Sequence, residues 1–425
     1  MFLEIGVDIN VDAADLFTGS DCPYGTPLYR ACEGLHEELV LFLINQGADV
    51  NLRCSNYGCQ YALSMAAEKG HERIVRALLS AGADIDAVGE RTSHPKTALS
   101  AASGEGHISV VRLLLEHGAD INVRYQYYWC LNGKTYNGSP LILPVCHGDT
   151  PMVKLLLEHG VDTNISDSIR GNILQAAVDG NEEIMTLLLD TGLDVNAQSE
   201  HYLERRNPIS TVRSSALYIA AIQGRTEMVN LLLERGADVN LSGGAHGSAL
   251  CAAVSKGHES IVEALTRERN TKADQKQNRV SSIDDFNKSR ALCLAAELGH
   301  VEVAKLLLER GAGAKGEELL YNKALVTAAY RYHQSRREMV ILLLKRRRDW
   351  TVWNLSSYNT LFETTTDSEL YDIVELLIEV GASFEKALER GEAMPQDERV
   401  LRIVSEVISN QSAVRIWLDD FNHDD

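Results

Sequence analysis

The chain has 425 residues, of which 45% are apolar and 24% charged, and its formal net charge is −19. This length is too great for one compact core, so several domains or an array of repeats is expected, and the composition is that of a folded protein rather than a disordered one. The excess of acidic residues argues against nucleic acid and anionic membrane surfaces as partners, because both repel negative charge.

The N-terminal sequence MFLEIGVD has neither a basic start nor a long apolar stretch, so no secretory signal is expected. No apolar run approaches the ~18 residues needed to span a bilayer. The eight cysteines are scattered, which is typical of reduced thiols in an intracellular protein. We therefore expect a cytoplasmic protein. We also expect it to be a monomer. Segment 3–10, LEIGVDIN, matches only the end of the repeat described next, either as a degenerate cap or because the chain was cut from a longer parent.

A repeated segment dominates the sequence. Residues 97–122 (TALSAASGEGHISVVRLLLEHGADIN) align without a gap with residues 215–240, and the same template fits 26–51, 61–86, 139–164 and 171–196. Weaker copies begin near residues 248, 290, 323 and 359. One leucine-type anchor marks each of ten copies, at intervals of 32 to 44 residues: Leu28, Leu63, Leu99, Leu141, Ile173, Leu217, Leu250, Leu292, Leu325 and Leu361.

Each copy predicts two short helices. The first carries small residues such as Ala101 and Ala102, which allow neighbouring helices to approach closely. A Gly-His pair then predicts a left-handed turn, and an apolar stripe at helical spacing predicts the second helix. About 33 residues cannot bury enough surface to fold alone, so successive copies must stack.

These copies resemble ankyrin repeats over roughly residues 1–385, and Thr26-Pro27-Leu28 matches the opening tripeptide of that family. The resemblance implies an all-α solenoid of about ten helix–turn–helix repeats with β-turn or hairpin fingers. The histidine that usually follows the leucine is absent: Tyr29 stands there in the first copy. The hydrogen bonds that this histidine makes in the family must therefore be replaced or lost.

The connection over 123–138 is longer than usual and forms an aromatic finger. Alternating residues followed by Asn132-Gly133 predict a small β-hairpin. Exposed Tyr and Trp side chains are favoured binding anchors, although the rings could instead pack onto adjacent fingers. The candidate contact residues are Tyr125, Tyr127, Tyr128, Trp129 and Tyr136.

The fourth copy has Pro144 where other copies have alanine. Proline inside a short helix is expected to kink it, costing ~3 kcal/mol. Together with Cys146 and His147, this kink beside the aromatic finger marks a candidate specialised site, and drift in a non-critical repeat is the alternative.

The second long connection, 197–214, is polar. Its residues include His201, Tyr202 and Glu204, and its Arg205 and Arg206 could meet an anion or a carboxylate. We favour the alternative of a solvated loop.

The sequence divides into repeats over 1–269, a flexible insertion over 270–289 that could act as a hinge, repeats over 290–384 and a C-terminal cap over 385–425. The cap contains one amphipathic helix, 398–408, which is expected to shield the last repeat. The basic run 345–348 suits either nuclear import or the end of a helix, where cations complement the dipole.

Acidic residues recur where the first helices end. Stacked, they would line the concave surface as an acidic stripe suited to a basic peptide, unless they are ordinary solvated positions. The residues are Glu33, Glu68, Glu105, Asp179 and Glu297.

Catalytic motifs are not found. Phosphate-binding, dinucleotide-binding, nucleophile-elbow and HExxH patterns are missing from the sequence, and Cys54 and Cys59 lack partners at zinc spacing. Histidines such as His71 and His107 recur in register, which indicates a structural role in the turn. We therefore expect a non-catalytic scaffold that binds a protein or peptide without cofactor or metal. The alternative is an enzyme or small-molecule binder with a pocket near Tyr128, Trp129 and His147.

Overall fold

The computed structural model describes residues 8–11, 25–53, 61–88, 97–123, 125–129, 134–167, 171–204, 207–267, 285–313, 318–330 and 335–346. The chain divides into two compact units. The first comprises 1–220, 227–237 and 243–245, and the second comprises 221–226, 238–242 and 246–425.

Each unit is built from antiparallel helix pairs, and the described residues contain nine such pairs. Those up to the boundary are α2 (Pro27–Glu33) with α3 (Glu37–Asn45), α4 (Ala62–Glu68) with α5 (Glu72–Ser80), α6 (Ala98–Gly104) with α7 (Ile108–Glu116), α8 (Ile142–His147) with α9 (Thr150–Glu158), α10 (Ile173–Ala177) with α11 (Glu182–Asp190), and α12 (Ala216–Gln223) with α13 (Thr226–Glu234). The second unit contains α14 (Ala249–Ser255) with α15 (Glu259–Thr266), α17 (Asp285–Leu298) with α18 (Val301–Glu309), and α19 (Glu318–Tyr330) with α20 (Arg336–Arg346).

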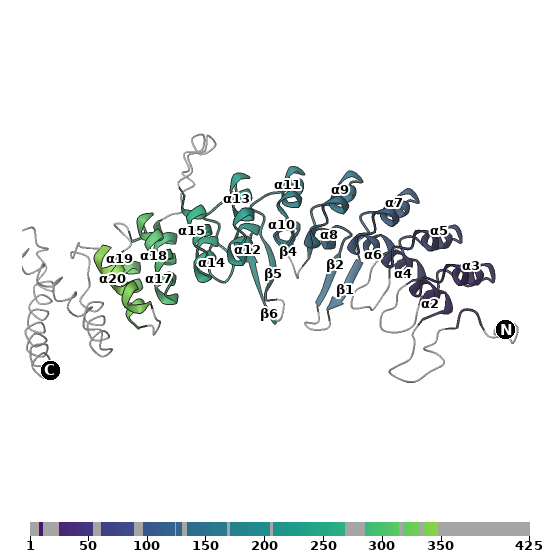
Figure 1. The fold of residues 1–425 in the computed structure, drawn as a ribbon, viewed down its shortest axis with the longest axis horizontal. Coiled ribbons are helices and arrows are strands. Elements are labelled where there is room, and N and C mark those ends of the chain that lie inside the picture. Colours follow the sequence, from purple (N-terminus) through teal and green to yellow (C-terminus); the bar gives the residue numbers. More distant parts are fainter. Residues whose placement is uncertain are drawn as a thin grey trace, which may run out of the picture. The chain divides into compact units, whose positions relative to one another are not determined.

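Within the first unit the first helices of the pairs form one layer and the second helices form another (Figure 1). The anchors Leu63 and Leu99 are each 1% exposed and lie in the contacting helices α4 and α6. Ile74, Val75 and Leu78 of α5 are completely buried. Successive pairs therefore share one apolar interior, as the repeat predicted. The copy expected near residue 359 and the expected cap helix 398–408 lie outside the described residues.

The turns use the expected backbone chemistry. Gly70 and Gly106 follow first helices and adopt left-handed conformations, with φ of 71° and 80°. Only glycine takes this conformation without steric strain.

A ladder of polar contacts joins the ends of successive repeats in the first unit. The side-chain oxygen of Asn51 accepts a hydrogen bond from the backbone N–H of Asp84 at 2.7 Å, and Asn122 accepts from Asp162 at 2.8 Å. Asn10 accepts from Asp49 at 2.8 Å in the same way. Residues 8–11 thus take the place of a repeat end, as expected for the partial first copy, whose residues 3–7 lie outside the described ones.

The second unit differs from the sequence analysis at one boundary. Helix α17 begins at Asp285, so residues 285–289, which we expected in the flexible insertion, are helical. Ser289 is fully buried and its hydroxyl accepts a hydrogen bond from the backbone N–H of Gly313 at 2.9 Å. This contact joins the early part of α17 to the turn that follows α18. Residues 270–284 lie outside the described part of the chain.

Candidate partner-binding surface

The aromatic finger is a β-hairpin. Strand β1 (Tyr125–Trp129) pairs antiparallel with β2 (Lys134–Gly138), and Tyr127 lies opposite Tyr136 in the register. The predicted hairpin is therefore confirmed, and it gathers all five aromatic residues into one ladder. The side chains of both strands lie outside the described ones, so a binding role for the rings stays a prediction.

The second long connection is also a hairpin, which the sequence analysis did not predict, and the expectation that it is solvated stays a prediction. Strand β5 (Ser199–Glu204) pairs with β6 (Asn207–Ser214), from Ser199 opposite Ser214 at the base to Glu204 opposite Asn207 at the tip, with a register irregularity between Tyr202 and Glu204. His201 and Tyr202 belong to β5. Arg205 and Arg206 lie between the strands and outside the described residues.

A short hairpin stands between the two long ones. It pairs β3 (Ser166–Asp167) with β4 (Gly171–Asn172). Strand β2 contacts β3, and β4 contacts β5. All three hairpins lie on the side of the first unit where the first helices are (Figure 1). We call strands β1 to β6 the finger row, since they form one continuous run of neighbouring hairpins.

Gln175 holds the finger row to the helices. This residue of α10 is 3% exposed, and its amide nitrogen donates to the carbonyl oxygen of Ser214 at 2.8 Å. Its amide oxygen accepts from the backbone N–H of Asn172 at 2.7 Å, while Asn172 accepts from the Gln175 backbone at 2.9 Å. This reciprocal capping box therefore begins α10 and fixes the base of the β5–β6 hairpin together.

A glycine turn holds the same hairpin from the other side. The backbone N–H of Gly244 donates to the carbonyl oxygen of Arg213 at 2.8 Å. A Cβ at Gly243 would come within 2.8 Å of that oxygen, and a Cβ at Gly244 would collide with the Tyr218 ring. Glycine is therefore required here, because the backbone approaches so closely.

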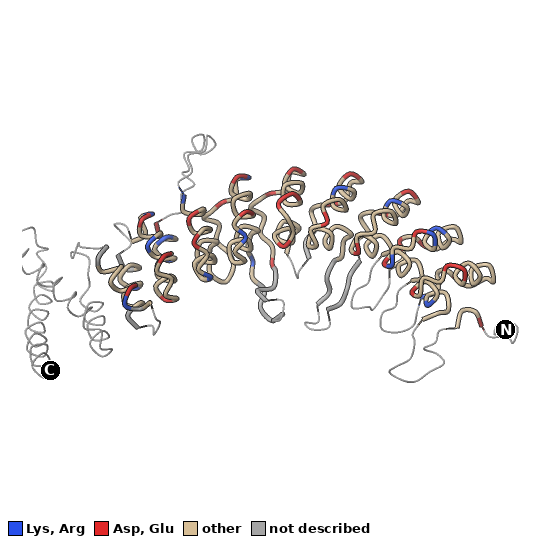
Figure 2. The backbone as a smooth tube through the Cα atoms, in the orientation of Figure 1, with Lys and Arg blue, Asp and Glu red and all other residues tan. Residues whose placement is uncertain are grey.

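The acidic residues lie at the ends of first helices, as expected, and acidic residues recur from pair to pair (Figure 2). Glu33 forms an ion pair with Arg30. The other four acidic residues also interact with neighbouring groups of the chain: Glu68, Glu105, Asp179 and Glu297. In the fourth pair the exposed His147 ends α8, at the position that Glu105 holds after α6. The run of carboxylates is therefore interrupted there.

Pro144 does not impose the expected cost. Helix α8 begins at Ile142, so Pro144 is its third residue, and Pro144 is buried. The N–H groups of the first turn have no acceptor within a helix, so proline loses no hydrogen bond there. The expectation of a kink costing ~3 kcal/mol was wrong because the helix starts later than the alignment of copies suggested.

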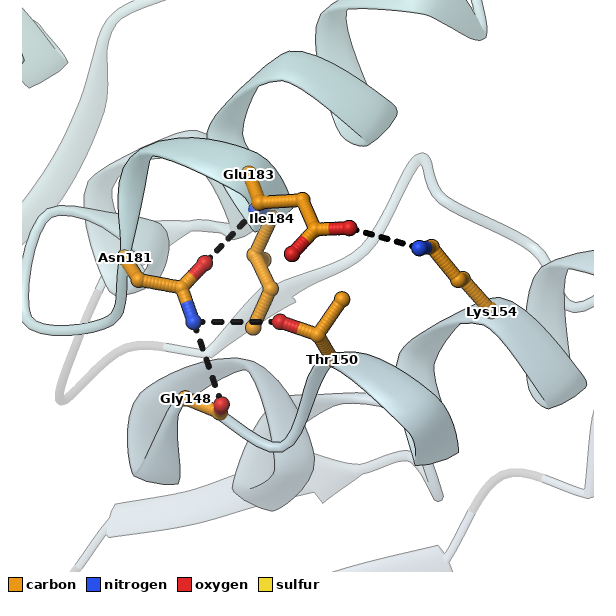
Figure 3. A network of polar contacts seen from close by, with 6 residues as sticks. All are labelled: Gly148, Thr150, Lys154, Asn181, Glu183 and Ile184. Carbon is orange, nitrogen blue, oxygen red and sulfur yellow. Dashed lines mark hydrogen bonds and ion pairs between the residues drawn. The ribbon is translucent and has the colours of Figure 1, made fainter.

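The recurring turn histidines are structural. His71 and His107 precede α5 and α7 as N-caps. The His107 Nε2 donates to the carbonyl oxygen of Glu68 at 2.9 Å, which ties one pair to the previous one. Asn181 does the same before α11: its amide donates to the Gly148 carbonyl and the Thr150 hydroxyl, both at 3.1 Å (Figure 3). These positions therefore serve stacking rather than catalysis.

Metal-binding clusters and reactive thiols were sought among the described residues. They contain no group of three or more His, Cys, Asp or Glu residues that could hold a metal ion. Burial raises the pKa of Cys32 to about 12 and that of Cys293 to about 11, so both thiols stay protonated at neutral pH. No helix in the described part of the chain is long and apolar enough to cross a membrane.

Comparison with known families agrees with this architecture. The family model for ankyrin repeats in sets of three copies matches residues 28–125, 126–199, 201–279, 217–318 and 250–353. These matches cover well over half of the chain, which therefore belongs to the ankyrin repeat family. Ankyrin repeats are generally protein–protein interaction modules, and proteins built from them are usually non-enzymatic scaffolds. No curated protein matches the chain in sequence.

The sequence analysis missed the residues that position the finger row. Gln175 follows Asn172 by three residues, which is the spacing of a capping box, and that signal was present in the sequence. Its contact with Ser214, 39 residues away, had no local signal.

Proposed function

We propose that this protein is a non-catalytic scaffold that binds a protein partner through the finger row and the adjoining ends of the first helices, the expected concave groove. The observation that carries the proposal is the finger row itself. Two long hairpins flank a short one, and Gln175 and Gly244 fix the base of β5–β6 to the repeats on either side. Stacking of helix pairs does not require such hairpins, so a binding role accounts for them best.

The residue types favour a peptide or protein segment that carries both apolar and basic side chains. Tyr127, Tyr128 and Trp129 would bury large apolar area at modest entropic cost. Carboxylates such as Glu105 and Asp179, in a chain of net charge −19, would attract Lys and Arg.

Site-specific photo-cross-linking tests this proposal. A photoreactive phenylalanine analogue replaces Tyr127 or Tyr202 in the finger row, and as a matched control it replaces Arg112, an exposed residue of α7. In native lysate we expect a discrete cross-linked protein from the two finger positions and none from the control.

A variant with Tyr127, Tyr128 and Trp129 replaced by Ala completes the test. We expect it to lose capture of that protein while its thermal unfolding stays nearly unchanged. Undiminished capture, or cross-links from position 112 alone, would remove the finger row from the binding surface.

A further inference from the structure

Three exposed cations on the first helices of the second unit form no ion pair. Lys256 directly follows α14, Arg290 belongs to α17 and Lys323 belongs to α19. None of the three takes part in the ion pairs of the described residues. The chain has 60 acidic and 41 basic residues, so carboxylates are plentiful and the lack of a partner for these cations needs an explanation.

Cations on the second helices of the same unit are neutralised locally. Lys305 of α18 pairs with Glu302 at 2.6 Å. Arg267 and Arg310, which follow α15 and α18, both pair with Glu263, at 3.4 and 3.9 Å. The second unit therefore pairs these positive charges on one helix layer and leaves three of them available on the other.

Arg290 is held by the backbone of a neighbouring turn rather than by a counter-ion. Gly247 lies just before α14 with φ of 87°, and a Cβ there would come within 2.8 Å of Nη1, 3.0 Å of Nη2 and 3.1 Å of Cζ of Arg290. Only glycine leaves room for a guanidinium so close to the backbone. Packing therefore fixes the place of the Arg290 guanidinium, which reduces the entropic cost of binding an anion.

Lys323 repeats the arrangement of Arg290 one repeat further on. Each of these cations stands two residues before the leucine anchor of its helix, and α17 and α19 contact each other. Burial raises the pKa of Cys251 and Cys293, which follow successive anchors, and the nearby charges of Arg290 and Lys323 oppose the rise at the first and the second thiol. The two cations therefore occupy equivalent places on neighbouring helices.

Lys256 adds positive charge to the turn against which Arg290 packs. Burial lowers the pKa of His246, the neighbour of Gly247, and the nearby charge of Lys256 lowers it further. Positive charges gathered in this way repel one another, and a bound anion would remove that repulsion.

We propose that these three residues, which we call the basic surface, bind an acidic segment of a protein partner. The Arg290 guanidinium would hold one carboxylate through two parallel hydrogen bonds, and Lys323 would hold a second carboxylate. Packed helices lie ~8–10 Å apart, which is the length of about three residues of an extended chain, so acidic residues at every third position fit the two cations. The basic surface uses no residue of the finger row, so either surface can bind without the other.

A fluorescein-labelled peptide with glutamate at every third position, separated by glycine and serine, provides the probe. The same peptide with glutamine in place of glutamate is its control. Fluorescence anisotropy with the full chain measures binding. At low ionic strength we expect the glutamate peptide to bind and the glutamine peptide to stay free, although the net charge of −19 opposes an acidic ligand. Added salt should weaken the binding, because it screens exposed charges.

Two pairs of substitutions locate the binding on the chain. Arg290→Gln combined with Lys323→Gln should weaken it by about tenfold or more, because two charge-assisted contacts are lost. Arg267→Gln combined with Lys305→Gln removes the same charge from the second helices and should change it by about twofold at most.

Gly247→Ala tests the placement of the guanidinium without changing any charge. The new Cβ would displace the Arg290 guanidinium, so binding of the glutamate peptide should weaken several-fold. Circular dichroism of each variant checks that the helices are intact.

Failure of the glutamate peptide to bind, or equal weakening by the two pairs of substitutions, would overturn the proposal. Undiminished binding by Gly247→Ala would show that the placed Arg290 is not the carboxylate receptor. Binding of a labelled oligothymidylate that the glutamate peptide fails to displace would also refute it, because the basic surface would then serve nucleic acid.

Discussion

Replacing Leu35 with glycine should make the first described repeat more stable. Leu35 has φ of 56°, whereas Gly70 and Gly106 hold the corresponding places in the next two repeats with φ of 71° and 80°. A Cβ at Gly70 would lie only 2.5–2.7 Å from atoms of the His107 ring. Leu35 has such a Cβ, which excludes His71 from the corresponding place. His71 instead accepts a hydrogen bond from the N–H of Ile74 in its own helix at 3.3 Å.

Four contributions set the size of the effect. Leu35→Gly removes ~1–2 kcal/mol of left-handed strain. It also lets His71 donate to the Glu33 carbonyl, as His107 donates to Glu68, and such a hydrogen bond is worth about 1 kcal/mol. His71 gives up its bond with the Ile74 N–H in exchange, which offsets about 1 kcal/mol, and the larger backbone entropy that glycine loses on folding offsets ~0.5–1 kcal/mol. The net expectation is a gain of about 1 kcal/mol.

Hydrogen exchange is the suitable assay, because repeats can open locally rather than in one transition. Amides of α2 to α5 should exchange about fivefold more slowly in Leu35→Gly, since 1 kcal/mol at 25 °C corresponds to that factor. Gly70→Leu is the matched reverse substitution one repeat further on, and it should speed amide exchange in α4 to α7, because its Cβ would displace His107. Faster exchange in Leu35→Gly would refute the assignment of strain to this residue.

Three further predictions concern the first unit. Gln175→Ala removes the partners of the Ser214 carbonyl and the Asn172 N–H. It should therefore lower the free energy of unfolding by about 3 kcal/mol in urea titrations and speed amide exchange in β5 and β6. Lys69→Ala, at an exposed residue, is the control. Burial and the nearby Asp120 and Asp84 carboxylates raise the pKa of Asp86, although the Asp120 backbone N–H donates a hydrogen bond to it. The charged form of Asp86 therefore opposes folding. The Asp86→Asn variant should be more stable than the unchanged chain at pH 7, by a margin that disappears below pH ~4. Gly180→Ala should cost about 2 kcal/mol in thermal unfolding, because its Cβ would lie 2.5 Å from the Val145 carbonyl oxygen, and no loss of stability would contradict that contact.

Local periodicity was enough to predict the helix pairs and one finger. The Gly-His turns and the buried anchors Leu63 and Leu99 follow from it, because each repeat has the same residue types at the same positions. The β1–β2 hairpin was visible in its alternating aromatic residues and Asn-Gly turn. The β5–β6 hairpin was not, since its charged and proline-containing strands are held by Gln175 and Gly244 from outside the segment.

The exposure of Leu39 (44%) and Phe42 (50%) in α3 could not be predicted for a different reason. Leu39 fits the apolar stripe of a second helix as well as Ile74 does, so the sequence gives no local signal of its exposure. Exposure depends on whether a neighbour is present, which is a property of the stack and not of the segment. Pro144 shows another limit of sequence analysis. Helix α8 begins at Ile142, later than the repeat alignment predicted, so the proline lies in the first turn and the expected kink does not follow.

Both attachments described for the β5–β6 hairpin lie at its base. Gln175 holds Ser214 and Gly244 holds Arg213, while Glu204 and Asn207 form the opposite end of the register. Foreign peptide sequences could therefore be grafted between Glu204 and Asn207 without disturbing the repeats, which would turn this hairpin into a display site for engineered recognition.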